Sequence, residues 1–86
     1  MIETAVKISD PAGMHARPAG DLVKIVKNFP GCTVTLDNGV RKVNAGSILS
    51  VLSLGLKCGA KVTVRAEGAS EEAALEAVTT FFANLG

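Results

Sequence analysis

Three stretches of the chain place apolar or β-branched residues at every second position, the period of a strand with one buried face. These inward positions are Ile2, Thr4, Val6 and Ile8 in the first stretch, Cys32, Val34 and Leu36 in the second, and Val62, Val64 and Ala66 in the third. After the second stretch, Asp37 precedes an Asn38-Gly39 pair. Because Asn-Gly tolerates positive φ at both central positions of a type I′ turn, we expect a hairpin that leads into another strand at Val40–Val43.

Three further segments carry the start and stop signals of helices. The first helix is expected to begin at Ala16 and to be closed by Pro30-Gly31. The second is capped by Ser47 and runs to about Leu54, where Gly55 ends it, and the third is capped by Ser70. The apolar faces of the two long helices are Ala19, Leu22, Val23, Val26 and Phe29, and then Ala74, Leu75, Val78, Phe82 and Leu85. A turn cluster at Asp10–Gly13 separates the first strand from the first helix.

The element order is therefore βαββαβα, within one domain that spans residues 1–86. Each strand buries a single face, and three helices are available to cover it. We expect an α+β fold, an open-faced sandwich with helices on one side of a four-stranded, mainly antiparallel sheet.

Composition narrows the function classes. Nine Lys and Arg against eight Asp and Glu give a formal net charge of +1, and there is no Trp or Tyr, so we expect no nucleic-acid partner. The chain lacks a signal peptide and an apolar run of about 18 residues, which predicts a cytoplasmic protein with no membrane insertion. Cys32 and Cys58 fit free thiols that act as small apolar residues, with a disulfide as the less favoured alternative, and no spacing suggests a metal or another cofactor.

Candidate chemistry centres on His15, which lies where a turn gives way to a helix. The early Pro18 suits such a start, and the free N–H groups of the first turn, with Ala16 and Arg17, favour bound phosphate. The positive helix end disfavours imidazolium, which helps keep His15 neutral and nucleophilic. A lone histidine near a helix start is more often a cap or a surface residue. The neighbouring Gly13, with Arg17 and Pro18, favours a phosphoryl acceptor instead.

One face of the first predicted helix also carries a basic band. Arg17, Gly20, Lys24 and Lys27 fall at i, i+3, i+7 and i+10, away from the apolar stripe. Such a band could dock an acidic partner, and its plain alternative is an ordinary solvated face. Gly20 is unusual inside a helix, and close approach of a partner would explain it.

The segments Gly13–Ala19 and Asn44–Gly55 closely resemble two motifs of HPr, the histidine-containing phosphocarrier family of the bacterial phosphoenolpyruvate-dependent sugar phosphotransferase system. The resemblance extends over essentially the whole chain and implies the same open-faced sandwich. It implies that His15 accepts a phosphoryl group on Nδ1 from phospho-enzyme I, with help from Arg17, and passes it to the IIA domains of sugar permeases. It also implies an apolar docking patch. Because transient docking to several partners favours a small, singly folded carrier, we expect a monomer. The residues of that patch are Ile48, Leu49 and Leu52, for which plain core is the alternative.

Ser47 aligns with the serine that HPr kinase/phosphorylase modifies in many members of the family. From its position alone it is a helix cap that needs no regulation. Regulated members usually carry Lys or Arg just before this serine, whereas this chain has Gly46. Phosphorylation of Ser47 is therefore a hypothesis that a kinase assay must test.

Three other functions compete with the carrier. A regulatory relative of HPr would bind partners without carrying phosphate, although retention of both His15 and Arg17 argues against it. An unrelated interaction or RNA-binding module fits the near-neutral charge poorly. An independent catalyst is disfavoured because the sequence indicates no second acid, base or metal cluster beside His15.

Overall fold

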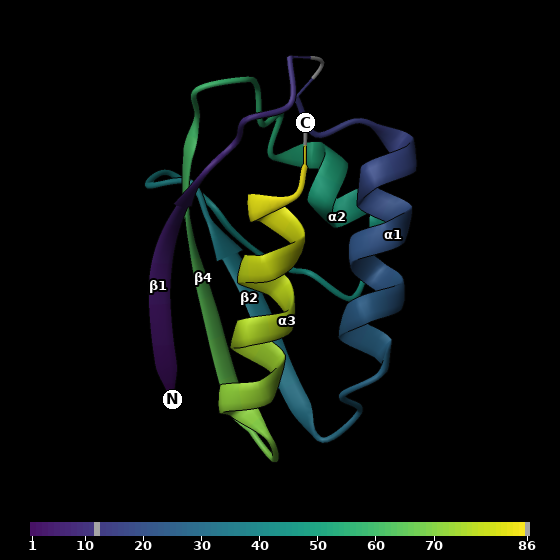
Figure 1. The fold of residues 1–86 in the computed structure, drawn as a ribbon, viewed down its shortest axis with the longest axis vertical. Helices are drawn as coiled ribbons and strands as arrows, with labels where there is room; N and C mark the ends of the chain where they lie inside the picture. Colours follow the sequence, from purple (N-terminus) through teal and green to yellow (C-terminus); the bar gives the residue numbers. More distant parts are fainter. Residues whose placement is uncertain (12, 86) are drawn as a thin grey trace.

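The computed structural model describes residues 1–11 and 13–85, and its four strands and three helices follow one another in the predicted order. The elements are β1 (Ile2–Lys7), α1 (Ala16–Lys27), β2 (Cys32–Asp37), β3 (Lys42–Asn44), α2 (Ile48–Ser53), β4 (Lys61–Gly68) and α3 (Glu71–Ala83). Figure 1 shows the three helices gathered on one side of the sheet. The predicted α+β open-faced sandwich is confirmed.

The sheet has the strand order β1-β4-β2-β3, and every neighbouring pair is antiparallel. Its register brings inward positions of different strands together, because Ala66 of β4 lies opposite Ile2 on one side and Val34 on the other. The same register places polar side chains on the open face. There Arg65 pairs with Glu3 at 3.3 Å and with Asp37 at 3.1 Å.

The core lies between the sheet and the helices and is almost entirely aliphatic. Its largest fully buried side chains are Phe82, Ile8, Leu22, Leu36, Val34, Val51, Val62, Val64 and Val78. Both cysteines are free, but only Cys32 is buried. The expectation that Cys58 also acts as an apolar residue is wrong, because it sits on the exposed loop between α2 and β4.

The β2–β3 hairpin differs from the predicted type I′ turn. Asp37 pairs with Lys42, so the connection spans residues 38–41 and β3 begins two residues later than expected. Side chains set this register. The Asn38 Oδ1 atom accepts the N–H groups of Val40 and Arg41, at 2.9 and 2.8 Å. In this loop Gly39 has a positive φ, +92°, and Asn38 does not, so the type I′ prediction is wrong.

The two predicted serine caps have different outcomes. Ser47 caps α2 as expected, and its Oγ atom accepts the Ser50 N–H at 3.4 Å. Ser70 occupies the N-cap position of α3, but its φ of 58° is left-handed and its side chain makes no capping bond in the described structure. The tight turn from β4 explains this conformation, since the Ala69 N–H bonds the Gly31 carbonyl at 2.9 Å immediately before it.

Candidate functional site at the start of helix α1

His15 is the N-cap residue of α1, as the sequence predicts. Its backbone is extended, with φ −109° and ψ −173°, and its side chain is exposed. Within the described residues the imidazole makes no capping hydrogen bond. The plain interpretation of His15 as a capping side chain therefore fails, and the ring is available to an incoming group.

The backbone beside His15 offers hydrogen-bond donors. The first helical bond runs from the Ala19 N–H to the His15 carbonyl, at 3.0 Å. The N–H groups of Ala16 and Arg17 therefore precede the helical ladder, and Pro18, the third helical residue, has no N–H to leave unpaired. Together with the exposed Arg17 side chain, these two N–H groups supply the donors that a phosphate oxygen needs.

A shallow hollow of about 480 Å³ contains this group of residues. It is lined by His15, Arg17, Pro18 and Asp21 from α1 and its cap, by Asp10 from the preceding loop, and by Asn84 and Leu85 after α3. Figure 1 shows why these segments meet, because the chain after α3 ends at the same end of the molecule as the start of α1.

Sequence reasoning missed two carboxylates in this hollow, Asp10 and Asp21, so the statement that no second acid or base accompanies His15 is wrong. Asp21 had a usable signal, because it lies four residues after Arg17 and therefore on the same helix face. Asp10 sits in the turn before His15, where the Gly13 N–H bonds its carbonyl at 2.8 Å. Asn84 and Leu85 carry no comparable signal.

Comparison with known proteins agrees with this geometry. Residues 2–84 match the family model described as "PTS HPr component phosphorylation site". The chain belongs to the HPr family. It is 38% identical over 85 residues to the phosphocarrier protein HPr of Buchnera aphidicola subsp. Acyrthosiphon pisum, covering 99% of each chain.

Solved structures of the HPr family have the same fold. HPr-C-His from Thermoanaerobacter tengcongensis superposes with a TM-score of 0.91 at 35% identity, over 96% of this chain and 92% of that one. A structure titled as an HPr dimer from the same organism matches with a TM-score of 0.76 at 34% identity, over 100% of this chain and 99% of that one. HPr-fold chains are thus known in dimeric form.

The basic band of this HPr-family chain lies on the exposed side of α1. Arg17, Lys24 and Lys27 are exposed, and Gly20 is half-buried between them. A Cβ atom added to Gly20 would lie 4.0 Å from Cδ1 of Ile48, an ordinary contact. Packing within the chain therefore does not require glycine at position 20. The same distance shows that the basic band lies beside α2.

The predicted apolar patch on α2 divides between surface and core. Ile48 is 43% exposed and Leu49 is 80% exposed, so plain core is excluded for both. Leu52 is half-buried and packs against the core. Because Ile48 lies over Gly20, the apolar patch and the basic band form a continuous surface. We call Ile48, Leu49 and Leu52 the α2 patch.

Gly46 lies in a tight turn beside the side chain of Asn44. Its N–H bonds the Oδ1 atom of Asn44 at 2.7 Å. A Cβ atom at position 46 would lie 2.9 Å from the same oxygen, so a side chain there must displace the Asn44 amide. This turn delivers the chain to Ser47, which is half-buried as the cap of α2.

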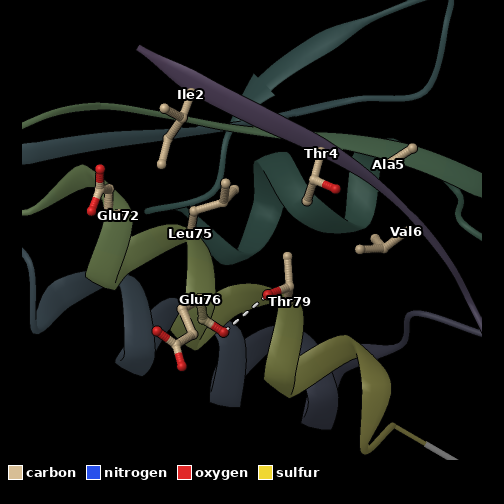
Figure 2. A pocket seen from close by; sticks show the side chains of 8 residues that line it. All are labelled: Ile2, Thr4, Ala5, Val6, Glu72, Leu75, Glu76 and Thr79. Atoms are coloured by element: carbon tan, nitrogen blue, oxygen red, sulfur yellow. Dashed lines mark hydrogen bonds between the residues drawn. The ribbon is translucent and has the colours of Figure 1, made fainter.

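A second hollow, of about 450 Å³, lies between β1 and α3 (Figure 2). Its lining residues are Ile2, Thr4, Ala5, Val6, Glu72, Leu75, Glu76 and Thr79. This lining holds carboxylates and hydroxyls but neither a histidine nor a cationic side chain, so it differs in chemistry from the hollow that contains His15 and Arg17. Within residues 1–11 and 13–85, no three His, Cys, Asp or Glu side chains come close enough to hold a metal, and no helix is long and apolar enough to cross a membrane.

Proposed function

We propose that this chain is a stoichiometric phosphoryl carrier of the sugar phosphotransferase system. His15 takes the group from phospho-enzyme I and passes it to the IIA domains of sugar permeases. The observation that supports this proposal is the exposed, uncapped imidazole beside two N–H groups that precede the helical ladder and beside Arg17.

The transfer step uses the lone pair of one ring nitrogen of His15, which the family resemblance assigns to Nδ1. Its lone pair forms a bond to phosphorus while the bond from phosphorus to the donor breaks, and that electron pair leaves with the donor. The Ala16 and Arg17 N–H groups and the Arg17 guanidinium bind the phosphoryl oxygens as the group arrives. The reverse sequence of events delivers the group to the acceptor. The chain therefore regains its unphosphorylated state only after one partner has donated the group and a second partner has accepted it, which is the behaviour of a carrier.

Docking uses the surface next to His15. The basic band provides electrostatic attraction to acidic partners, and the α2 patch provides apolar area that a partner can bury. The resemblance to HPr implies that these partners are enzyme I and the IIA domains. The carrier works in the cytoplasm, and it works as a monomer because transient docking to several partners favours a small, singly folded chain. Ser47 modification by HPr kinase/phosphorylase would add charge at the edge of the α2 patch, which would repel acidic partners.

Intact-mass measurement after incubation with phosphoenolpyruvate and enzyme I tests the proposal directly. We expect the chain to gain one phosphoryl group that is lost in acid, and the His15→Ala variant to gain none. An Arg17→Lys variant should gain the same group more slowly, because an ammonium cannot bind two oxygens in a planar fork. If folded chain binds enzyme I without gaining mass, the regulatory relative of HPr becomes the correct function.

A further inference from the structure

The loop that carries His15 is held at both ends by a segment distant in sequence, residues 56–60 between α2 and β4. Ile8 exchanges two backbone hydrogen bonds with this segment, donating to the Ala60 carbonyl at 2.9 Å and accepting from the Gly59 N–H at 2.8 Å. At the other end of the loop, the Met14 N–H bonds the Leu56 carbonyl at 2.8 Å. The side chains of Met14 and Leu56 are 6% and 4% exposed, so the core anchors both partners of this last bond.

Gly13 allows the His15 loop to lie closer to the backbone of Leu56 and Lys57 than any other residue could. Its φ is +73°, and a Cβ atom there would lie 2.6 Å from the Leu56 oxygen and 2.9 Å from the Lys57 Cα atom. Both are backbone atoms, which cannot swing aside as a flexible side chain can. Only glycine therefore allows the two backbones to approach this closely.

His15 follows this contact by two residues, so its backbone is restrained on both sides. The Met14–Leu56 bond fixes the residue before it, and the Ala19–His15 bond fixes the helix after it. Because the exposed side chain makes no capping bond of its own, its position depends on this restrained backbone. We infer that residues 56–60 are a positioning element for phosphoryl transfer, which acts through Gly13 and Met14 to aim the His15 ring. This inference rests on the proposed carrier function.

The size of the effect follows from the contact distance. An added methyl at position 13 would lie 2.6 Å from the Leu56 oxygen, whereas Cβ contacts below 3.0 Å are essentially not found and ordinary contacts begin at 3.4 Å. The two backbones must therefore separate by about 0.4 to 0.8 Å. A misplacement of about 1 Å at a reacting group lowers rates by roughly 100-fold. We expect Gly13→Ala to lower kcat for phosphorylation by enzyme I by about 10- to 100-fold.

Gly39→Ala is the matched control. Gly39 also has a positive φ, +92°, but a Cβ atom there would meet nothing within 4 Å, and it lies on the distant β2–β3 loop. The two variants therefore share the backbone cost of a left-handed alanine and differ in the clash. We expect Gly39→Ala to keep kcat within twofold of the parent chain. Because the α2 patch is untouched, KM should stay within about threefold for both variants.

A second perturbation approaches the contact from the other side, in case Gly13→Ala does not fold. One glycine inserted between Lys57 and Cys58 alters the segment and leaves residues 13–15 unchanged, and it should also lower kcat rather than KM. Amide NMR spectra should show shifts at residues 8–17 and 56–60, with the sheet unchanged.

The outcomes separate this inference from the function on which it rests. If the parent chain accepts no phosphoryl group, the carrier function is wrong. If the parent chain accepts it and folded Gly13→Ala and the insertion variant do so at the parental kcat, residues 56–60 are merely structural and the inference is overturned. An equal loss in Gly39→Ala would also overturn it.

Discussion

Leu49 offers the sharpest test of how this chain docks, because its side chain is 80% exposed in a chain whose other leucines are mostly buried. Full burial of a leucine side chain contributes about 1.5–3 kcal/mol, so the area still exposed is worth roughly 1–2 kcal/mol to a partner that covers it. Because about 1.4 kcal/mol corresponds to a factor of ten, Leu49→Ala should raise the KM of enzyme I for this chain about 5- to 30-fold.

The same substitution should leave two other quantities unchanged. The free energy of unfolding should move by less than about 0.5 kcal/mol, because the side chain touches little in the free chain. The kcat should also hold, since neither His15 nor the 56–60 segment is altered. Steady-state phosphorylation at varied chain concentration separates KM from kcat, and urea unfolding measures stability.

Val40 provides the control for this experiment. It is 89% exposed, but it lies at the tip of the β2–β3 hairpin rather than on the α2 patch. Val40→Ala should therefore change neither KM nor kcat. Equal effects of the two substitutions, or a KM for Leu49→Ala within twofold of the parent value, would show that the α2 patch is not where the partner binds.

Three further predictions concern stability. The Gly39 N–H lowers the pKa of Asp37, partial burial opposes this, and Arg65 adds to the lowering. Native Asp37 therefore stabilises the fold above about pH 4, and this stabilisation is lost as pH falls through its lowered pKa. The urea midpoints of the parent chain and of Asp37→Asn should therefore converge in acid. A difference between the midpoints that stays constant with pH would contradict this. Phe82→Ala should cost about 3–5 kcal/mol in urea unfolding, because Phe82 is fully buried. Ser47→Ala should cost about 0.5–1 kcal/mol by the same method, since its capping bond is long, and no loss would show that the cap is inactive.

Most of the fold could be predicted because its strands and helices follow local periodicity. The inward positions of β2 and β4 are buried as their alternation indicates, and Val34 and Ala66 face each other across those strands. Because every strand buries only one face, the three helices must lie together on that face of the sheet. The local periodicity and this one-sided burial together predict the antiparallel open-faced sandwich.

The local errors arise where a side chain or a distant contact overrides a dipeptide preference. Asn-Gly favours a two-residue turn, yet the carbonyl of the Asn38 side chain accepts two N–H groups further along the loop, and this displaces the pairing of β3. Ser70 has the composition of a cap, yet the preceding turn bonds to Gly31 and leaves Ser70 in a left-handed conformation. In both cases the partner groups lie outside the residues that define the expected turn or cap, in Val40 and Arg41 for the hairpin and in Gly31 for α3.

The site shows the same division between local and tertiary causes. The position of His15 at the N-cap follows from residues 13–29 alone, since a turn residue, a proline and an apolar helical stripe determine where α1 begins. Asn84 and Leu85 reach the hollow only because α3 packs along β1 and β4 and ends near the start of α1 (Figure 1). The 56–60 segment reaches Gly13 only because the start of β4 pairs with the end of β1, where Lys61 lies opposite Lys7. The location of the proposed nucleophile is therefore encoded locally, but the surface that surrounds it and the contact that we infer to position it depend on strand order, which no short motif contains.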